Sequence, residues 1–200
     1  MAPLVRQPSL LDGGPPRLDA SFATARRRDL GRGAWIDEAP GWVAGADQLF
    51  DEIAAAAPWA AHERPMYDRV VDVPRLVTGR WEAPPEPIPA AARLLGERYG
   101  LDLSAVSANL YRDGADSVAW HGDRIGRVRR VTVVALVILG EPRRFLLRPT
   151  GGGPSIALDP GPGDLLVLGG TCQTTFEHCV PKRAHAGPRI SVMFREPVDV

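Results

Sequence analysis

The sequence has only two cysteines, Cys172 and Cys179, and they lack the CxxC spacing of a redox or metal-binding motif. This pattern excludes a disulfide-stabilised scaffold, and we expect both thiols to be free, as in a reducing cytosol. The chain also has no long hydrophobic run, because the longest, residues 131–139, is too short to span a bilayer. The N-terminal stretch "MAPLVRQPSLLDGG" lacks the apolar core of a signal peptide. We therefore expect a soluble cytoplasmic protein that does not associate with membranes.

The chain has no net charge, because 24 basic residues balance 24 acidic residues. No global electrostatic field therefore attracts a polyanionic partner, although a local basic patch is still compatible with nucleic-acid binding. Lys182 is the only lysine, so nearly every positive charge is an arginine. A group of arginines lies close together in the sequence, at positions 124, 127, 129, 130, 143, 144 and 148. They are compatible with an ordinary solvated face or with a phosphate-binding track.

The length of 200 residues is typical of one domain with a substantial hydrophobic core. Residues 1–34 are rich in Pro, Gly and Arg and show no sustained hydrophobic period. This composition predicts an extended N-terminal arm, followed by a single domain over residues 35–200.

Apolar residues at helical spacing predict two helices in the first half of the domain. The first covers residues 47–57, where Asp47 is suited to cap its N-terminus. The second covers residues 89–99 and is followed by Gly100, a residue that commonly ends helices.

After Gly100 the pattern changes to short β-rich runs separated by turn residues such as "RDGAD", "TGGGP" and "DPGPGD". The predicted strands are 105–111, 117–121, 131–139, 143–148, 155–158, 164–168, 174–179 and 189–195. Many short strands at this spacing are typical of a sandwich or barrel. We predict a mainly β fold, in which a double-stranded β-helix (jelly-roll) core of about eight strands spans residues 104–196 and two N-terminal helices buttress it.

The stretch "SVAWHGDRIGR" places His121 and Asp123 two residues apart at the end of a predicted strand. Residues i and i+2 of a strand face the same way, so the imidazole and the carboxylate point to one place. One more histidine completes the set of two His and one carboxylate that holds Fe(II) and leaves three positions open. The candidates are His62, His178 and His185, of which His178 ends a strand that a jelly roll can bring beside His121. By itself, an HxD pair is more often an ordinary surface or hydrogen-bonded pair.

The last predicted strand, "PRISVMFRE", carries alternate residues that share one face: Arg189, Ser191, Met193 and Arg195. If this face points inward, two guanidinium groups are buried without an acidic partner on their own face, which is costly unless an anionic ligand compensates. Arginine suits a carboxylate because its planar fork bonds both oxygens. Asn109 and Tyr111 share a face of another strand and are placed to hydrogen-bond the same ligand. An iron triad beside a carboxylate-binding arginine indicates a 2-oxoglutarate-dependent oxygenase.

Four ordered motifs resemble one family over about Pro74 to Glu196: "DVPRL", "NLYRDGADSVAWHGD", "HCVPK" and "PRISVMFR". The sequence is similar to AlkB-type Fe(II)/2-oxoglutarate-dependent dioxygenases, which repair alkylated nucleic acid. The separation of Asp123 and His178 is also close to the usual separation in this family.

The resemblance implies a role for each matching residue. His121, Asp123 and His178 are implied as the Fe(II) ligands. The resemblance also implies five residues that bind 2-oxoglutarate. Arg189 pairs with one of its carboxylates, and Asn109 and Tyr111 hydrogen-bond it. Arg195 and Ser191 complete the pocket. Ser191 stands where many members have Asn. The third reactant is O₂.

The resemblance also implies a nucleotide-recognition region at about residues 60–85. Tyr67 and Trp81 are candidates to stack on a base, or else to pack at the edge of the core. Arg124 and Ile125 follow the first two iron ligands, and Ile125 stands where many members have an acidic residue that contacts the base. Trp120 is predicted to belong to the core.

The predicted function is removal of N-alkyl groups from damaged bases in DNA or RNA, with release of formaldehyde, succinate and CO₂. The expected substrate is single-stranded nucleic acid or a flipped base, and the protein is expected to be a monomer. One alternative is a 2-oxoglutarate-dependent oxygenase that acts on a protein or a small molecule. A second alternative is a non-catalytic nucleic-acid-binding β-barrel.

Overall fold

The computed structural model describes Leu4, Arg6 and residues 14–66 and 69–198. Every strand predicted after Gly100 is present, with bounds that differ by no more than a few residues. They are β7 (Ala105–Tyr111), β8 (Val118–His121), β9 (Thr132–Gly140), β10 (Phe145–Pro149), β11 (Ile156–Leu158), β12 (Leu165–Gly170), β13 (Phe176–Val180) and β14 (Arg189–Arg195).

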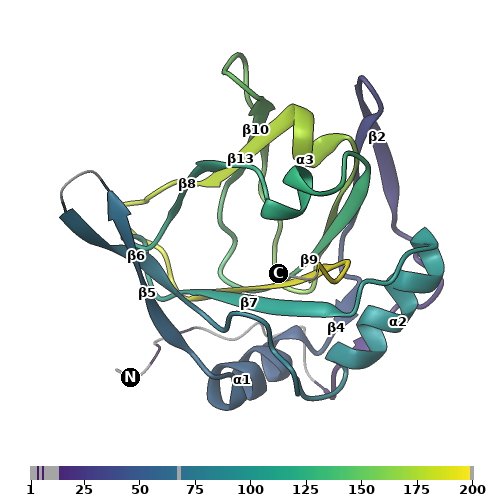
Figure 1. Ribbon diagram of the computed structural model, residues 1–200. Coiled ribbons are helices and arrows are strands. Elements are labelled where there is room, and N and C mark those ends of the chain that lie inside the picture. The colour runs from purple at the N-terminus through teal and green to yellow at the C-terminus, as the bar shows by residue number, and fades with distance from the viewer. Residues whose placement is uncertain (1–3, 5, 7–13, 67–68, 199–200) are drawn as a thin grey trace.

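These strands form two sheets that face each other (Figure 1). The smaller sheet has the order β11-β10-β13-β8, and the larger sheet contains β12-β9-β14-β7 at its centre. All recorded strand pairs are antiparallel. The predicted mainly β fold with a jelly-roll core is therefore confirmed.

The larger sheet is extended at both edges by strands that the sequence patterns did not predict. The strands before the core are β1 (Arg17–Leu18), β2 (Arg26–Gly31), β3 (Ala34–Ala39), β4 (Val43–Ala44), β5 (Ala60–Met66) and β6 (Arg69–Val77). β2 and β3 add to β12 at one edge, whereas β6 and β5 add to β7 at the other.

The region predicted as an N-terminal arm, for which the sequence allows one strand or turn near Phe22, contains β2, an edge strand of the larger sheet. Its sequence, "RRRDLG", is polar and exposed and has no hydrophobic alternation. It pairs with β3 through an antiparallel backbone ladder, and side-chain contacts support this pairing: Arg27 pairs with the buried Asp37 at 2.7 Å and lies over the ring of Trp35. A pairing of this kind leaves no hydrophobic period in the sequence.

Two helices cover the face of the larger sheet that points away from the smaller one (Figure 1). They are α1 (Ala46–Ala56) and α2 (Ile88–Tyr99), as predicted. Gly100 ends α2 in the left-handed conformation with φ of 66°. Asp47 does not cap α1, because Gly45 occupies the N-cap position and Asp47 lies in the first turn. Two shorter elements, η1 (Arg124–Arg127) and α3 (Cys172–Thr175), lie near the centre of the fold.

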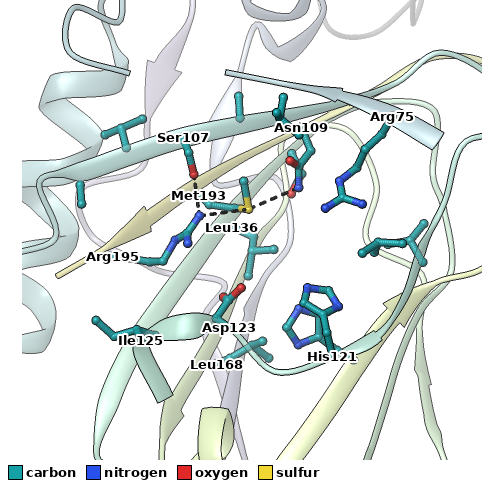
Figure 2. Close-up of a pocket in the computed structure, with 18 of the residues that line it drawn as sticks. Arg75, Ser107, Asn109, His121, Asp123, Ile125, Leu136, Leu168, Met193 and Arg195 are labelled. Atoms are coloured by element: carbon teal, nitrogen blue, oxygen red, sulfur yellow. Dashed lines mark hydrogen bonds between the residues drawn. The ribbon is translucent and has the colours of Figure 1, made fainter. Parts of the chain in front are cut away.

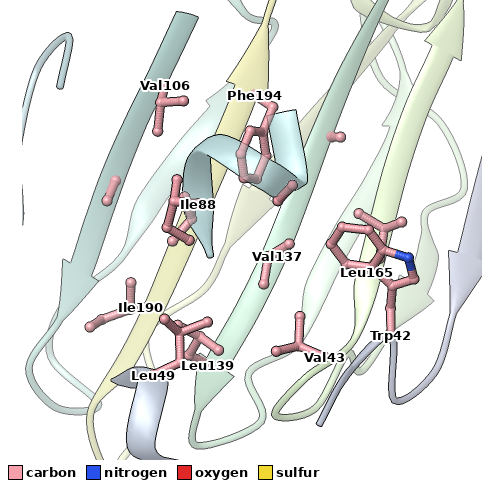
Figure 3. Packing of buried hydrophobic residues seen from close by; sticks show 14 of the residues in the cluster. Trp42, Val43, Leu49, Ile88, Val106, Val137, Leu139, Leu165, Ile190 and Phe194 are labelled. Carbon is pink, nitrogen blue, oxygen red and sulfur yellow. The ribbon is translucent and has the colours of Figure 1, made fainter. Parts of the chain in front are cut away.

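Strand β9 is buried on both faces, which explains why its sequence, "TVVALVILG", is almost entirely apolar. Val133, Ala135, Val137 and Leu139 pack toward the helices with residues such as Trp42, Leu49 and Phe194 (Figure 3). The intervening residues Val134, Leu136 and Ile138 belong to the second cluster, between the two sheets. Both faces of the strand are buried, so periodicity alone does not distinguish its two sides.

Cys172 and Cys179 are both buried and free, as expected. In the part of the chain that the structure describes, no helix combines the length and apolar character needed to cross a membrane.

Candidate active site

Two neighbouring strands of the smaller sheet bring together the predicted metal-binding side chains. His121 ends β8, Asp123 follows two residues later, and His178 lies opposite His121 in the ladder between β13 and β8. The potential ligand atoms of these three residues all lie within 4.8 Å of one another. His185 lies on an exposed loop elsewhere, and the side chain of His62 is outside the described part of the structure.

The surroundings of the three residues hold them in defined orientations. Nδ1 of His121 lies 2.8 Å from the carbonyl oxygen of Ala119. Because a carbonyl can only accept, Nδ1 carries the proton and Nε2 keeps its lone pair for a metal. The backbone N–H of Asp123 donates to Oε1 of Gln173, on α3, at 3.0 Å. The ring of Phe145 stacks on His178 with centroids 5.1 Å apart.

The protonation states also suit a divalent metal. Burial lowers the pKa of His178 to about 4, so this imidazole is neutral near pH 7. Burial tends to raise the pKa of Asp123, but the positive charges around it, above all Arg195, outweigh burial and hold this pKa below its usual value. A neutral imidazole, as at His178, and an ionised carboxylate, as at Asp123, are the forms that bind metal. The donor set of two His and one carboxylate therefore fits Fe(II).

The three residues line a cavity of about 530 Å³ between the two sheets (Figure 2). The residues predicted to bind the co-substrate line the same cavity: Asn109, Tyr111, Arg189, Ser191 and Arg195. Its apolar wall includes Leu136 and Leu168, so the polar groups converge on a largely hydrophobic chamber, as is usual for small-molecule sites.

Arg189 is the most unusual side chain of this cavity. It is 1 % exposed, and none of its three guanidinium nitrogens has a hydrogen-bond partner among the described residues. Burial lowers its pKa, and Tyr111, whose ring centroid lies 5.2 Å from Cζ, opposes this effect. The Ser191 hydroxyl nearby is also without a partner in the described structure. Leaving a buried guanidinium unpaired is costly, so this end of the cavity is suited to an anion.

Arg195, at the other end of strand β14, is already engaged. Its Nη2 donates to the Ser107 hydroxyl at 2.6 Å and contacts Sδ of Met193, which also accepts from Asn109 (Figure 2). Its charge acts on Asp123, so Arg195 lies on the side of the cavity nearest the metal ligands.

Three further polar residues of the site did not emerge from the sequence as site residues. Arg75, on β6, lines the cavity and has no described partner for its Nε, while its Nη1 donates to Ser117 at 3.4 Å. It belongs to the "DVPRL" motif, and this motif is the feature of the sequence that could have identified Arg75 as a site residue. Gln173 and Glu196 have no motif, and only the packing of α3 and of the segment after β14 brings them here.

The predicted substrate-binding residues have different outcomes. Tyr67 lies outside the described residues, as does the side chain of Arg124. Trp81 is only 7 % exposed and belongs to the hydrophobic cluster between the larger sheet and the helices, as expected of a residue that packs in the core. Ile125 is buried and lines the cavity. Trp120 is not a core residue as predicted, because it is half-buried and covered by the guanidinium of Arg148, 3.9 Å away.

Three of the clustered arginines are committed to structural contacts instead of a phosphate track. Arg148 pairs with Glu177 at 2.6 Å and Arg144 pairs with Asp159 at 3.2 Å. Arg143 is 0 % exposed. Its guanidinium donates to the carbonyl oxygens of three loop residues, Asp113, Asp116 and Pro181, each at 2.9 Å. Arg143 thus ties together loops at one end of the smaller sheet.

Replacing Arg143 by Met is expected to lower the free energy of unfolding by about 3 kcal/mol or more, because three carbonyl groups lose their donor and each unsatisfied buried group costs about 1–3 kcal/mol. Urea unfolding measures the change. Arg144→Ala is the matched control, since its exposed ion pair contributes no more than about 1 kcal/mol. Equal effects of the two substitutions contradict this role of Arg143.

Comparison with known proteins places the chain in a family. Residues 59–195 match the model of the 2OG-Fe(II) oxygenase superfamily. Because this match covers more than half of the chain, the protein belongs to that superfamily, and its cofactor and co-substrates are Fe(II), 2-oxoglutarate and O₂.

More particular relatives are the alpha-ketoglutarate-dependent dioxygenases alkB homolog 3 of Bos taurus and Homo sapiens. They are 30% and 29% identical to this chain, over 75% of its length in both cases. The chain spans 61% of the length of each of these relatives. The AlkB-type resemblance of the motifs is thus confirmed by overall sequence similarity.

Solved structures show the same fold at lower identity. The structure of OsALKBH1 has a TM-score of 0.61 at 12% identity and covers 86% of this chain and 100% of that one. A 2OG-Fe(II) oxygenase family oxidoreductase from Burkholderia pseudomallei has a TM-score of 0.50 at 18% identity, over 74% of this chain and 78% of its own.

Proposed function

We propose that this protein is an oxidative demethylase that removes N-alkyl groups from bases in DNA or RNA, releasing formaldehyde, succinate and CO₂. The observation that carries the proposal is one cavity that holds the His121–Asp123–His178 cluster and the unpartnered guanidinium of Arg189. The AlkB-type motifs and the similarity to alkB homolog 3 support the substrate class.

Each part of the cavity has a task in this proposal. His121, Asp123 and His178 hold Fe(II), which supplies with O₂ and 2-oxoglutarate the oxidation of a carbon–hydrogen bond. Arg189 binds a carboxylate of 2-oxoglutarate through its planar fork, and Tyr111 and Asn109 line the same part of the cavity.

The apolar walls of the cavity surround the place where the alkylated base reacts. Leu136, Leu168 and Ile125 exclude water around the reacting groups. The alkyl group of the base has to lie beside the metal ligands, on the side left open by the three protein groups. Hydroxylation of an N-methyl carbon produces a group that separates as formaldehyde and leaves the unmodified base.

The position of Ile125 favours a second candidate function. It places a buried aliphatic side chain in the cavity where the resemblance leads one to expect an acidic contact to the base. This lining favours either a neutral alkylated base or a different substrate, a protein or small molecule oxidised by the same iron site. A non-catalytic β-barrel has no observation of this kind in its favour.

A substrate panel tests the proposal. The protein with Fe(II), 2-oxoglutarate and O₂ is incubated with methylated single-stranded and double-stranded oligonucleotides and with methylated peptides, and products are identified by mass spectrometry. We expect loss of methyl groups from oligonucleotides with an equal yield of formaldehyde. Oxidation of peptides alone, with intact oligonucleotides, overturns the proposal in favour of the second candidate. We also expect single strands to be preferred and the active protein to be a monomer.

A further inference from the structure

The segment Arg127–Val131, "RVRRV", which we name the rim loop, has an unusual surface. Val128 is 70 % exposed and Val131 is 66 % exposed, and they are the large hydrophobic residues that the described part of the chain leaves open to solvent. Arg127, Arg129 and Arg130 are exposed between and beside them. Single exposed valines need no explanation, but two among three arginines form a mixed apolar and cationic surface.

The rim loop lies next to the cavity. The backbone N–H groups of Val128 and Arg129 both donate to the carbonyl of Ile125, a cavity-lining residue, at 3.0 and 2.8 Å. Nη1 of Arg129 is 3.4 Å from Oε1 of Glu196, which also lines the cavity. The loop is therefore attached to the cavity wall at two points, and its other side chains are exposed to solvent.

Packing against α3 supports the position of the loop. A Cβ on Gly126 would lie 2.4 Å from the carbonyl oxygen of Gln173, so only glycine allows η1 to approach α3 this closely. The Thr174 hydroxyl donates to the carbonyl of Arg130 at 3.5 Å. Figure 1 shows α3 and the short coil of η1 side by side between the two sheets. Through Gln173, the same α3 also holds the backbone of Asp123.

The charges of the rim loop are largely uncompensated. Arg129 is paired with Glu196, whereas Arg127 and Arg130 form no ion pair with any residue that the structure describes. Glu196 is itself held by the Thr132 hydroxyl at 2.8 Å, so the Arg129 contact fixes the loop and leaves its two neighbours available. Arg32, at the β2–β3 turn, lies close by, because its carbonyl accepts from the Thr171 hydroxyl just before α3.

We propose that the rim loop binds the backbone of single-stranded nucleic acid beside the cavity, with Arg127 and Arg130 on phosphates and Val128 and Val131 against sugars or bases. This inference rests on the proposed function, which brings nucleic acid to the cavity that this loop adjoins. Free guanidinium groups interleaved with apolar side chains match a chain of phosphates interleaved with apolar faces. Arg129 is a positioning residue that keeps the loop at the rim.

Salt dependence of binding tests the proposal. The protein, loaded with Fe(II) and 2-oxoglutarate under anaerobic conditions, is titrated with a fluorescent unmodified oligodeoxythymidylate between 50 and 200 mM salt. The slope of log affinity against log salt is negative, and each lost phosphate contact on a single strand reduces its magnitude by about 0.7. The double variant Arg127→Ala/Arg130→Ala is therefore expected to reduce the magnitude of the slope by about 1.4, so that between 50 and 200 mM salt it loses about sevenfold less affinity than the wild type.

A matched control separates a local site from a general charge effect. Arg17→Ala/Arg26→Ala removes the same charge from exposed positions on β1 and β2, away from the cavity. This control is expected to leave the slope unchanged. Val128→Ser/Val131→Ser is expected to weaken binding severalfold at every salt concentration with the slope retained. An unchanged slope in the Arg127/Arg130 variant, or an equal fall in the control, overturns the proposal.

The outcomes distinguish this surface from the demethylase proposal. If the slope falls as expected but no methylated strand is oxidised, the rim loop binds nucleic acid and the demethylase proposal fails. If methylated strands are oxidised but the slope is unchanged, the demethylase proposal stands and the rim loop is not the binding surface. Tighter binding of poly-L-glutamate than of the oligonucleotide also overturns the inference, because it indicates an acidic protein partner.

Discussion

Replacing Asp123 by Ala is expected to abolish oxidation and to lower Fe(II) affinity by more than about 100-fold. Loss of a residue that only hydrogen-bonds a metal ligand lowers metal affinity by up to about 100-fold, and loss of a ligand itself should cost more. The carboxylate is the one anionic donor of the cluster, and imidazole ligands supply no negative charge to balance a divalent cation. The same result is expected for His178→Ala. Metal titration under anaerobic conditions and 2-oxoglutarate decarboxylation measure the two effects.

The control for this prediction is His185→Ala, which changes an exposed histidine that does not line the cavity. It is expected to keep both iron binding and turnover. Full turnover by Asp123→Ala contradicts the assignment of the cluster. Loss of iron from His185→Ala with retention in His178→Ala means that the structure and the motifs identify the wrong second histidine.

Replacing Arg189 by Ala is expected to raise the KM for 2-oxoglutarate by well over tenfold, with Fe(II) affinity nearly unchanged. Truncating one partner of a buried, charge-assisted pair costs about 2–5 kcal/mol, and each 1.4 kcal/mol or so is a tenfold change in affinity. Arg189→Lys is expected to recover only part of the loss, because an ammonium group cannot bond both carboxylate oxygens. Decarboxylation measured against 2-oxoglutarate concentration gives the three KM values.

Stability provides an independent measurement for Arg189. Without 2-oxoglutarate its three nitrogens lack partners among the described residues, so Arg189→Met is expected to leave the melting temperature unchanged or to raise it. Added 2-oxoglutarate is expected to stabilise the wild type and not the variant, since only binding to the folded state raises stability. Arg144→Ala, an exposed substitution outside the cavity, should behave as wild type. A variant whose KM and thermal shift match those of the wild type disproves the carboxylate-binding role.

The core strands were predictable because their signals are local. Turn sequences such as "RDGAD" and "DPGPGD" bound each run, and β-rich composition distinguishes these runs from the two helices before Gly100. The least successful region was the N-terminal one. Strand β2 has no hydrophobic alternation, and it joins the sheet by backbone pairing with β3, supported by the contacts of Arg27 with Asp37 and Trp35, which no local pattern shows.

The sequence by itself determined the eight core strands, the two helices and the motifs that place His121, Asp123 and Arg189 in an AlkB-type oxygenase, because these depend on residue spacing within short segments. Only the tertiary structure decided which polar groups share the cavity and which arginines remain free. Neighbours far away in the chain decide the exposure of two arginines. Arg143 is buried and donates to carbonyl groups of two loops, whereas Arg130 is exposed and its carbonyl accepts from Thr174. Arg75, Gln173 and Glu196 enter the site for the same reason, since the burial and pairing of a charged group depend on the strands and loops that pack around it.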